Sequence, residues 1–499
     1  MIKTATAFTT DHKQLQALYD NAERILLSSV KAFGDRSVLV NSPNAEEMTL
    51  NAEVLGATTL AAYHPEAALN TVKAFLATQR EDGRLADRVC CRDGYVFPKY
   101  DVLTGFCFAE EALSLYYFTR KKDVELLDAL LSALERFDTY LWQYHDLNFN
   151  NCLELFAESE TEEGGKTCRF SPVKEDHYGE ILEFSPFPVE SGDLMACDIA
   201  IRNTIAHIYA LREDREHEIE WRKKADAVCS NLKQMFWEAE EGACFDRDYR
   251  GAVMDALLIN NLFMMYYGAF DREMARTFVE RHLKDAQGFS SAFPLPTVAI
   301  GDAHFVNEDA PNFKGQPRGM TYRRAIGALE RYGFFADLTA IGKSFLHAVE
   351  EGGFAEQFDP FTGKATGALD EYTPTAATVL TLIEGFFGIR QQMGSLYWGA
   401  LGHAQGHTSE YRLEKGDETF RLVAEWDTTS GFMNDQPLFT VTNGMRVITN
   451  LRGEVLRVIN VTDQPIDGVL VCGGKVHSFS LASDEAFDLQ SVRRRARRM

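Results

Sequence analysis

The chain has 499 residues, and 51 Lys and Arg against 74 Asp and Glu give a formal net charge of −23. A surface this acidic argues against a nucleic acid or an anionic membrane as the main partner. Hydrophobic residues make up 45% and charged residues 25% of the chain, which is ordinary globular composition with ample material for a large core.

The first residues contain no apolar stretch long enough for a signal peptide, and no later run approaches the length of a membrane span. The nine cysteines are irregularly spaced and include no CxxC pair. This pattern favours reduced thiols over a disulfide framework or a zinc site. We therefore expect a cytoplasmic protein that needs no metal or other cofactor.

The chain from about residue 11 to residue 388 carries apolar residues at helical spacing. The pattern predicts twelve helices, at 13–33, 48–62, 66–79, 103–118, 124–144, 194–211, 218–237, 252–267, 271–284, 319–332, 334–350 and 372–387. Tight turns and long loops alternate between them, as expected for six helical hairpins. We therefore predict an (α/α)6 barrel over residues 1–393. An irregular helical solenoid is the alternative, but it would not require alternating loop lengths.

The sequence pattern changes from helical spacing to short β-rich runs after about residue 394. Short β-rich runs such as 438–442 and 455–461 alternate with Gly, Asn and Asp. We predict a small all-β domain, similar to an antiparallel sandwich, over residues 394–490. The last segment, 491–499, is Arg-rich, and we interpret it as a disordered tail rather than a nucleic-acid-binding one.

Candidate site residues fall in the long loops, where a barrel would gather them at one end. In the first such loop, Tyr100 and Asp101 precede a predicted helix. Asp101 is placed to accept hydrogen bonds from sugar hydroxyls, and a helix cap is the equally weighted alternative.

The second long loop ends in the run Val189-Glu-Ser-Gly-Asp, which brings Glu190, Asp193 and Asp198 to the start of a helix. Glycoside hydrolysis needs one protonated carboxyl as acid and one ionised carboxylate as base or nucleophile. We favour Asp193 as the acid. The alternative is that Ser191 or Asp193 only caps the helix.

The segment 312–318 of the fifth long loop contains Phe313, Gln316 and Arg318. It is polar and carries an aromatic ring, so it is suited to one wall of a pocket. Gln316 and Arg318 are candidate substrate ligands, although an ion pair is the commoner fate of a lone Arg.

The sixth long loop, 352–363, carries a single acidic side chain, Glu356, between two phenylalanines and before two turn dipeptides. A carboxylate held between aromatic rings suits carbohydrate chemistry. We favour Glu356 as the base, facing Asp193 across a gap that holds one water, as in inverting enzymes. Glu371, which leads into the last helix together with Tyr372, is the rival base.

The order of these motifs resembles the glycoside hydrolases related to trehalase. The motifs are Gln79-Arg-Glu-Asp-Gly, Glu190-Ser-Gly-Asp, Phe313-Lys-Gly-Gln-Pro-Arg-Gly and Phe354-Ala-Glu-Gln-Phe-Asp-Pro-Phe-Thr-Gly. Within that clan the similarity is to family 63, which includes processing α-glucosidase and mannosylglycerate hydrolase, and it spans about residues 50–390. The resemblance implies an (α/α)6 barrel with inverting chemistry. Carried over, the acid is Asp193 and the base Glu356, with Glu190 and Asp101 as sugar contacts.

Three positions depart from the family pattern. The family's E-S-G-x-D is one residue shorter here, which keeps Asp198 as an alternative acid. Phe313 and Tyr372 stand where the family has tryptophans.

Two other readings remain. A sugar epimerase or a polysaccharide lyase on the same barrel would rely on loop histidines such as His177 and His304. A carbohydrate-binding homologue without activity is the non-enzyme reading. For every reading we expect a saccharide ligand, while the sequence leaves the oligomeric state open.

Overall fold

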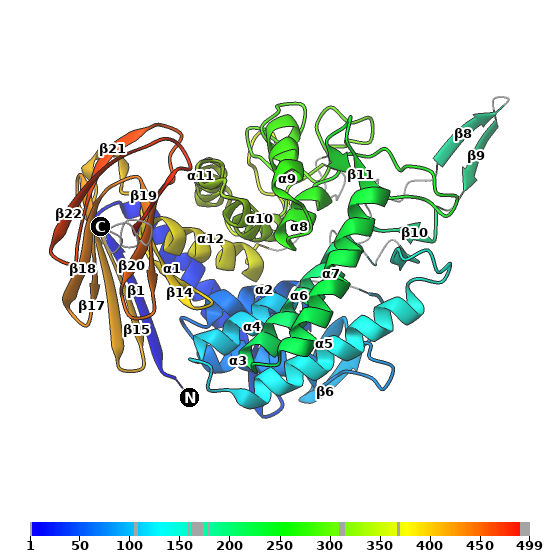
Figure 1. Ribbon diagram of the computed structural model, residues 1–499, viewed down its shortest axis with the longest axis horizontal. Coiled ribbons are helices and arrows are strands. Elements are labelled where there is room, and N and C mark those ends of the chain that lie inside the picture. Colours follow the sequence, from blue (N-terminus) through cyan, green and yellow to red (C-terminus); the bar gives the residue numbers. More distant parts are fainter. Residues whose placement is uncertain are drawn as a thin grey trace.

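The computed structural model describes residues 2–103, 108–157, 160, 173–177, 180–184, 186–308, 315–366 and 370–489. Within these residues the chain forms a helical region and a β-rich C-terminal region, which lie side by side in Figure 1. The α-helices are α1 (Lys13–Ser28), α2 (Leu50–Leu60), α3 (Pro65–Leu76), α4 (Ala109–Phe118), α5 (Val124–Tyr144), α6 (Gly192–Leu211), α7 (Arg215–Phe236), α8 (Asn260–Tyr266), α9 (Arg272–Phe278), α10 (Gly319–Tyr332), α11 (Phe335–Gly352) and α12 (Thr373–Phe387).

The even-numbered helices pack against one another in a closed series. Each of α2, α4, α6, α8 and α10 contacts the next, and α12 contacts α2. We call these six the inner helices. Their sequences explain the position: α6 and α12 are buried on nearly all sides, whereas α7 buries residues only at three-and-four spacing, from Trp221 to Phe236.

The inner helices run in the same direction. At their starts, Gly319 of α10 lies against Thr375 of α12, where an added Cβ would come within 1.9 Å of the threonine hydroxyl. Towards their ends, Thr59 of α2 and Thr381 of α12 share a hydrogen bond of 2.8 Å. The long connections therefore meet at one end of the helical region and the short turns at the other.

Local signals set several helix ends. The Asp123 side chain accepts from the Leu126 amide over 3.0 Å and caps α5. Gly333, at φ +86°, ends α10 in the left-handed region that glycine enters without strain. Only one residue then separates Gly333 from α11, so this connection is a tight reversal.

Two antiparallel sheets make up the β-rich region. The seven-stranded sheet has the order β1-β15-β16-β17-β18-β21-β22, and the five-stranded sheet has the order β13-β14-β19-β20-β23. The rings of Phe420 and Phe439 from the first sheet pack against Trp398 of the second. The strands are β1 (Thr4–Thr10), β13 (Ile389–Gln392), β14 (Ser395–Ala400), β15 (Ser409–Lys415), β16 (Glu418–Ala424), β17 (Thr428–Met433), β18 (Gln436–Thr442), β19 (Met445–Asn450), β20 (Val455–Asn460), β21 (Ile466–Cys472), β22 (Lys475–Leu481) and β23 (Ala486–Asp488).

Strand β1 comes from the opposite end of the sequence. It pairs with β15 along its whole length, from Thr4 opposite Lys415 to Thr10 opposite Ser409. Phe8 is buried in this pairing, with its ring 5.2 Å from that of Tyr19 on α1. The first residues thus tie the β-rich region to the first helix.

Several predicted elements differ from the structure. The helix predicted at 252–267 begins only at Asn260, because residues before it form β-bridges, Arg247 with Val253 and Leu258 with Val298. The helix predicted at 13–33 ends at Ser28, and the helix predicted at 103–118 begins at Ala109.

Short strands also occupy the connections. They are β2 (Val30–Phe33), β3 (Arg36–Leu39), β4 (Glu47–Thr49), β5 (Arg88–Arg92), β6 (Tyr95–Lys99), β7 (Glu154–Leu155), β8 (Val173–His177), β9 (Glu180–Phe184), β10 (Val189–Glu190), β11 (Trp237–Glu238) and β12 (Ala243–Cys244). The β8–β9 hairpin projects away from the helices (Figure 1). None of the helices in the described ranges is both long and apolar enough to cross a membrane. The Arg-rich segment 491–499 lies outside the described residues.

Candidate active site

The candidate acid, Asp193, lies in the first turn of α6 and has no solvent exposure. Ser191 caps this helix, since its hydroxyl accepts from the Leu194 amide over 3.2 Å, and it also donates to Asp193 Oδ1. The capping alternative therefore holds for Ser191.

A buried carboxylate fixes the backbone just before Asp193. The amide of Gly192 donates to Asp246 Oδ1 over 3.0 Å, and Asp246 is 4% exposed. A side chain at position 192 would come within 2.7 Å of the Met264 methyl group, so glycine allows α6 and α8 to approach closely here. Asp246 was not among the predicted site residues, because its own loop carries no recognisable motif.

The candidate base, Glu356, is held by an arginine. Nη2 of Arg318 donates to Glu356 Oε1 over 2.9 Å, and the side chains are 9% and 20% exposed, respectively. The Gly319 amide also donates to the Glu356 carbonyl over 3.1 Å. The Glu356 loop is thereby attached to the start of α10, and the carboxylate keeps limited access to solvent.

The candidate acid and base lie at the same end of the helical region. Asp193 begins α6, while Glu356 lies in the connection that enters α12. In the series of inner helices, α6 and α12 are three steps apart in either direction, which places them across from each other.

Tyr372 precedes α12 and is 4% exposed. Burial, and then the charge of Glu356, raises the pKa of its hydroxyl. The phenol therefore stays protonated close to the candidate base. Its amide donates to the Phe354 carbonyl over 2.8 Å, which links the start of α12 to the Glu356 loop.

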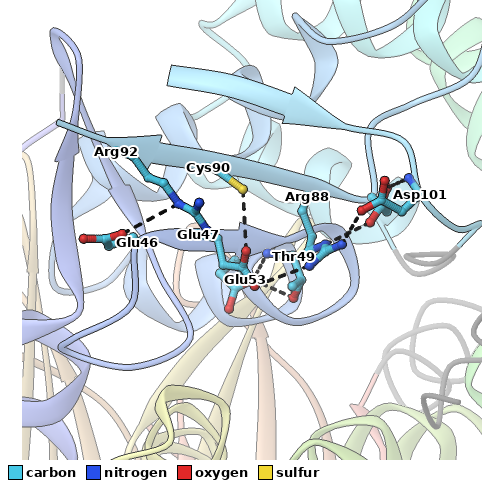
Figure 2. Close-up of polar contacts among 9 residues, drawn as sticks. Glu46, Glu47, Thr49, Glu53, Arg88, Cys90, Arg92 and Asp101 are labelled. Carbon is cyan, nitrogen blue, oxygen red and sulfur yellow. Dashed lines mark hydrogen bonds and ion pairs between the residues drawn. The ribbon is translucent and has the colours of Figure 1, made fainter. Parts of the chain in front are cut away.

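Glu53, in the first turn of α2, is a further carboxyl close to Tyr372, and sequence reasoning missed it. It is 1% exposed and contributes to the raised pKa of Tyr372. Oε2 accepts from the amide and hydroxyl of Thr49, as Figure 2 shows, whereas Oε1 is buried without a hydrogen-bond partner among the described residues. Burial raises the pKa of Glu53 to about 8. Its side chain is thus mostly neutral at pH 7.

Asp101 lies outside this group. It follows β6 rather than opening a helix, since α4 begins only at Ala109, and its side chain is 60% exposed. Arg88 Nη2 donates to Asp101 over 2.6 Å, and the two point toward each other in Figure 2. The adjacent Tyr100 donates its hydroxyl to the Thr78 carbonyl. Both residues thus have hydrogen-bond partners in or next to the first long connection.

Two other predicted substrate ligands have protein partners. Glu190 is 7% exposed and accepts from the amide groups of Asn148, over 3.3 Å, and Asn150. Gln316 is fully buried, donates to the Glu308 carbonyl and accepts from the Thr366 hydroxyl, each over 2.8 Å. Phe313 lies outside the described residues.

The two rival catalytic residues lie in ion pairs of their own. Asp198 is buried, with Arg202 at 2.9 Å and the indole N–H of Trp142 at 3.1 Å. Glu371 pairs with Arg24 over 2.8 Å, with side-chain exposures of 41% and 54%. These placements favour structural roles for both carboxylates.

An epimerase or lyase would rely on loop histidines, but the described contacts join none of them to these carboxyl groups. Nε2 of His304 lies 3.2 Å from Asp255, whose side chain is 90% exposed. The side chain of His177 lies outside the description. Among the described side chains, no group of three or more His, Cys, Asp and Glu is placed to hold a metal ion.

A family model, the mannosylglycerate hydrolase MGH1-like glycoside hydrolase domain, matches residues 48–373. The mannosylglycerate hydrolase of Rubrobacter radiotolerans is 25% identical over 172 residues, which are 34% of this chain. That match spans 38% of the Rubrobacter protein, or about two fifths of its length.

Solved structures share the fold at low identity. The GH63 mannosylglycerate hydrolase from Thermus thermophilus, in complex with glucose, has a TM-score of 0.60 at 16% identity, covering 73% of this chain and 99% of that one. A GH78 family rhamnosidase of Bacillus sp. GL1 has a TM-score of 0.58 at 12% identity, covering 84% of this chain and 40% of that one.

Proposed function

We propose, from the premise that the chain belongs to the mannosylglycerate hydrolase MGH1-like glycoside hydrolase family, that it is an inverting glycosidase. Its substrate would be an α-linked mannoside, glucoside or related small saccharide. Asp193 would protonate the leaving oxygen while Glu356 removes a proton from the attacking water. The observation that supports this proposal is a fully buried carboxyl at the start of α6 and an arginine-bound carboxylate in the connection that enters α12. These two inner helices are three steps apart in the closed series.

Asp193 suits the acid because burial disfavours a charged carboxylate, which would lose its hydration. The N-terminus of α6 acts in the opposite direction, since a helix dipole stabilises negative charge there by roughly 0.3–1 kcal/mol at exposed sites. In its protonated form Asp193 would donate its proton to the departing oxygen.

Glu356 suits the base because the guanidinium of Arg318 stabilises its negative charge. Its side chain is 20% exposed, so water can reach the carboxylate. Inverting glycosidases hold their two carboxyl groups roughly 6.5–9.5 Å apart, which leaves room for one water. We expect that separation between Asp193 and Glu356 when substrate is bound.

Glu53 and Tyr372 extend this proposed site. The protonated carboxyl of Glu53 has one oxygen without a hydrogen-bond partner among the described residues. The carboxyl lies close enough to Tyr372 to raise the pKa of its hydroxyl, as Glu356 also does. A neutral carboxyl can both donate to and accept from a sugar hydroxyl. We assign Glu53 the binding of a substrate hydroxyl next to the reacting centre.

We further propose that the twelve helices form an (α/α)6 barrel. The closed series of contacts among the inner helices and the fold shared with the Thermus hydrolase support it. The division into a catalytic region, 1–393, and a β-rich domain, 394–490, remains part of the proposal. Strand β1 would then be an N-terminal contribution to the second domain's sheet.

The Rubrobacter relative makes α-mannosylglycerate the first substrate to test. The screen should also contain α-glucosylglycerate, aryl α- and β-glycosides and small disaccharides, with proton NMR of the first-formed sugar. The proposal predicts that an α-glycoside releases the β-anomer first. Release of the α-anomer would contradict inversion, and a product isomeric with the substrate would indicate an epimerase instead.

A further inference from the structure

A cavity of about 450 Å³ lies towards the end of the helical region opposite Asp193 and Glu356. Its lining includes Thr59 near the end of α2 and His207 near the end of α6. His207 is fourteen residues beyond Asp193 (207 − 193). At 1.5 Å per residue this is roughly 21 Å along the helix. The cavity is therefore separate from the proposed active site, and its size is typical of small-molecule sites.

The cavity lies where the helical region meets the five-stranded sheet. Arg390 of β13 and Tyr397 of β14 form part of its wall, together with Glu330 of α10. Glu330 pairs with Arg390, and also with Arg446 of β19 behind it. An occupant would contact both regions of the molecule.

One cation of the cavity, Arg323, forms no ion pair in the described part of the chain. Glu330 and Glu110 pair with Arg390 and Arg331, respectively. Arg323, by contrast, forms no ion pair among the described residues, and its Nη2 donates only to the Thr58 hydroxyl, over 2.8 Å. Burial, with the nearby charge of Arg390, lowers the pKa of Arg323 to about 10, so the side chain stays cationic at neutral pH.

Three donor groups of the lining lack acceptors among the residues that the structure describes. The hydroxyl of Tyr266 and the Nε atoms of Arg323 and Arg390 are buried without a hydrogen-bond partner there. Tyr266 is 6% exposed, so its hydroxyl has little access to bulk water. Folded proteins rarely leave buried donors unsatisfied. A ligand that brings acceptor oxygens into the cavity would complete them.

Two carboxyl groups of the lining, Glu111 and Glu384, raise the pKa of Arg323, but burial has the larger and opposite effect. Neither Glu111 nor Glu384 forms an ion pair within the described part of the chain. Burial raises the pKa of Glu111 to about 8 and that of Glu384 to about 7. Their protonated forms, with the Ser114 hydroxyl nearby in the lining, offer hydrogen bonds to ligand hydroxyls.

We propose that this cavity is a second ligand site, which binds a small hydroxylated carboxylate between the helical region and the five-stranded sheet. The ligand carboxylate accepts from Arg323 and Tyr266, and its hydroxyl contacts Glu111 and Ser114. Arginines also stabilise helix C-termini through the helix dipole. If Arg323 served only in this way, its Nε and the Tyr266 hydroxyl would still lack hydrogen-bond acceptors among the described residues.

Lactate and propane-1,2-diol form a matched pair of probes, because they differ only in a carboxylate against a hydroxymethyl group. Calorimetric titration of the full chain should show lactate binding at least about tenfold more tightly than the diol, since hydrogen bonds to charged groups are the stronger ones. Arg323→Gln should weaken lactate binding by at least about tenfold, and Tyr266→Phe by roughly three- to tenfold. Arg212→Gln, at the surface of the α6–α7 turn, is the matched control and should leave binding unchanged.

A crystal structure with lactate locates the bound molecule. Electron density for lactate in the cavity, together with weaker lactate binding by Tyr266→Phe, supports the proposal even if Arg323→Gln fails to fold. Equal binding of both probes, equal binding by Tyr266→Phe and the unsubstituted chain, or lactate found only beside Glu356 would overturn it. Water alone in the cavity at saturating lactate would do the same.

Discussion

Arg318 and Glu356 form a 2.9 Å ion pair in which the arginine precedes α10 and the glutamate lies in the connection before α12. The pair joins two inner helices at their starts, where the long connections meet. A carboxylate held in this way has a fixed position and a stabilised charge. Both properties are required of a base that positions one water molecule.

The first prediction concerns the two proposed catalytic carboxyl groups. Asp193→Asn and Glu356→Gln should each lower kcat by roughly 10²–10⁴-fold, because each removes one proton-transfer step. Circular dichroism should show an unchanged fold. Glu351→Gln, an exposed glutamate five residues before Glu356, is the control and should keep its rate. Near-normal rates in both variants would refute the assignment, and a loss in Glu371→Gln in place of Glu356→Gln would identify Glu371 as the base.

The second prediction concerns Arg318 as the residue that holds Glu356 in place. Arg318→Gln removes the 2.9 Å ion pair, so the carboxylate should be less well fixed and kcat should fall by roughly tenfold or more, with the fold unchanged by circular dichroism. Arg318→Lys keeps a cation at this position and should lose less activity. An unchanged kcat in Arg318→Gln would show that the ion pair is not needed to position Glu356.

The third prediction tests the neutral form of Glu53. Because burial raises the pKa of Glu53 to about 8, its ionisation should lower activity above that pH. Glu53→Gln retains a neutral side chain of the same shape, so it should keep activity at pH 7 and lose this alkaline limb. Glu53→Ala should lower kcat/KM by roughly tenfold or more, the usual effect of losing a buried polar contact. A strong loss in Glu53→Gln at pH 7 would mean that the ionised form is needed.

The fourth prediction concerns stability and pH. Burial raises the pKa of Glu111 to about 8 in the folded protein, from an ordinary value of 4.5. Between these values the unfolded chain releases a proton that the folded chain keeps, so the free energy of unfolding falls as pH rises through this window. One such group contributes a slope of at most about 1.4 kcal/mol per pH unit. Urea denaturation from pH 5 to 8 should show a flatter decline in Glu111→Gln, and an unchanged slope would contradict the raised pKa.

The fifth prediction concerns strand β1. Phe8 is 2% exposed and packs beside Tyr19 and Tyr411. Phe8→Ala should lower the free energy of unfolding by about 3–5 kcal/mol, the usual cost of emptying a phenylalanine site in a core. Thr9→Ala, on the exposed face of the same strand, should change it by at most about 0.5 kcal/mol. Similar denaturation midpoints for both variants would show that β1 adds little to the sheet.

The helical part of the fold was largely predictable because its signals are local. Helices such as α5 and α7 bury one face at three-and-four spacing, and the contrast between short and long connections separates the hairpins. The run before α8 was misassigned because Val253 and Leu258 form β-bridges, with Arg247 and Val298 respectively, and periodicity cannot distinguish such a segment from a helix. Strand β1 was missed for a related reason, since its partner lies some four hundred residues away.

The candidate site residues could be predicted only where a sequence motif contains them. The run around Asp193 and the loop of Glu356 carry such motifs, and family membership now supports the family-63 resemblance that they suggested. Glu53 and Asp246 lie in unremarkable sequence, and only burial and the neighbouring helices make them notable. Asp101 shows the converse, because its position before a predicted helix proved to be a strand end paired with Arg88.

The closed series of inner helices also constrains how the chain reaches its folded state. Individual hairpins such as α6 with α7 form from local contacts and need little loop closure. The contact of α2 with α12 and the pairing of β1 with β15 instead join segments more than three hundred residues apart. During synthesis, β1 and α2 therefore stay without these partners until β15 and α12 have emerged from the ribosome. We expect slow refolding with populated intermediates that contain helical hairpins but lack the completed edge of the sheet.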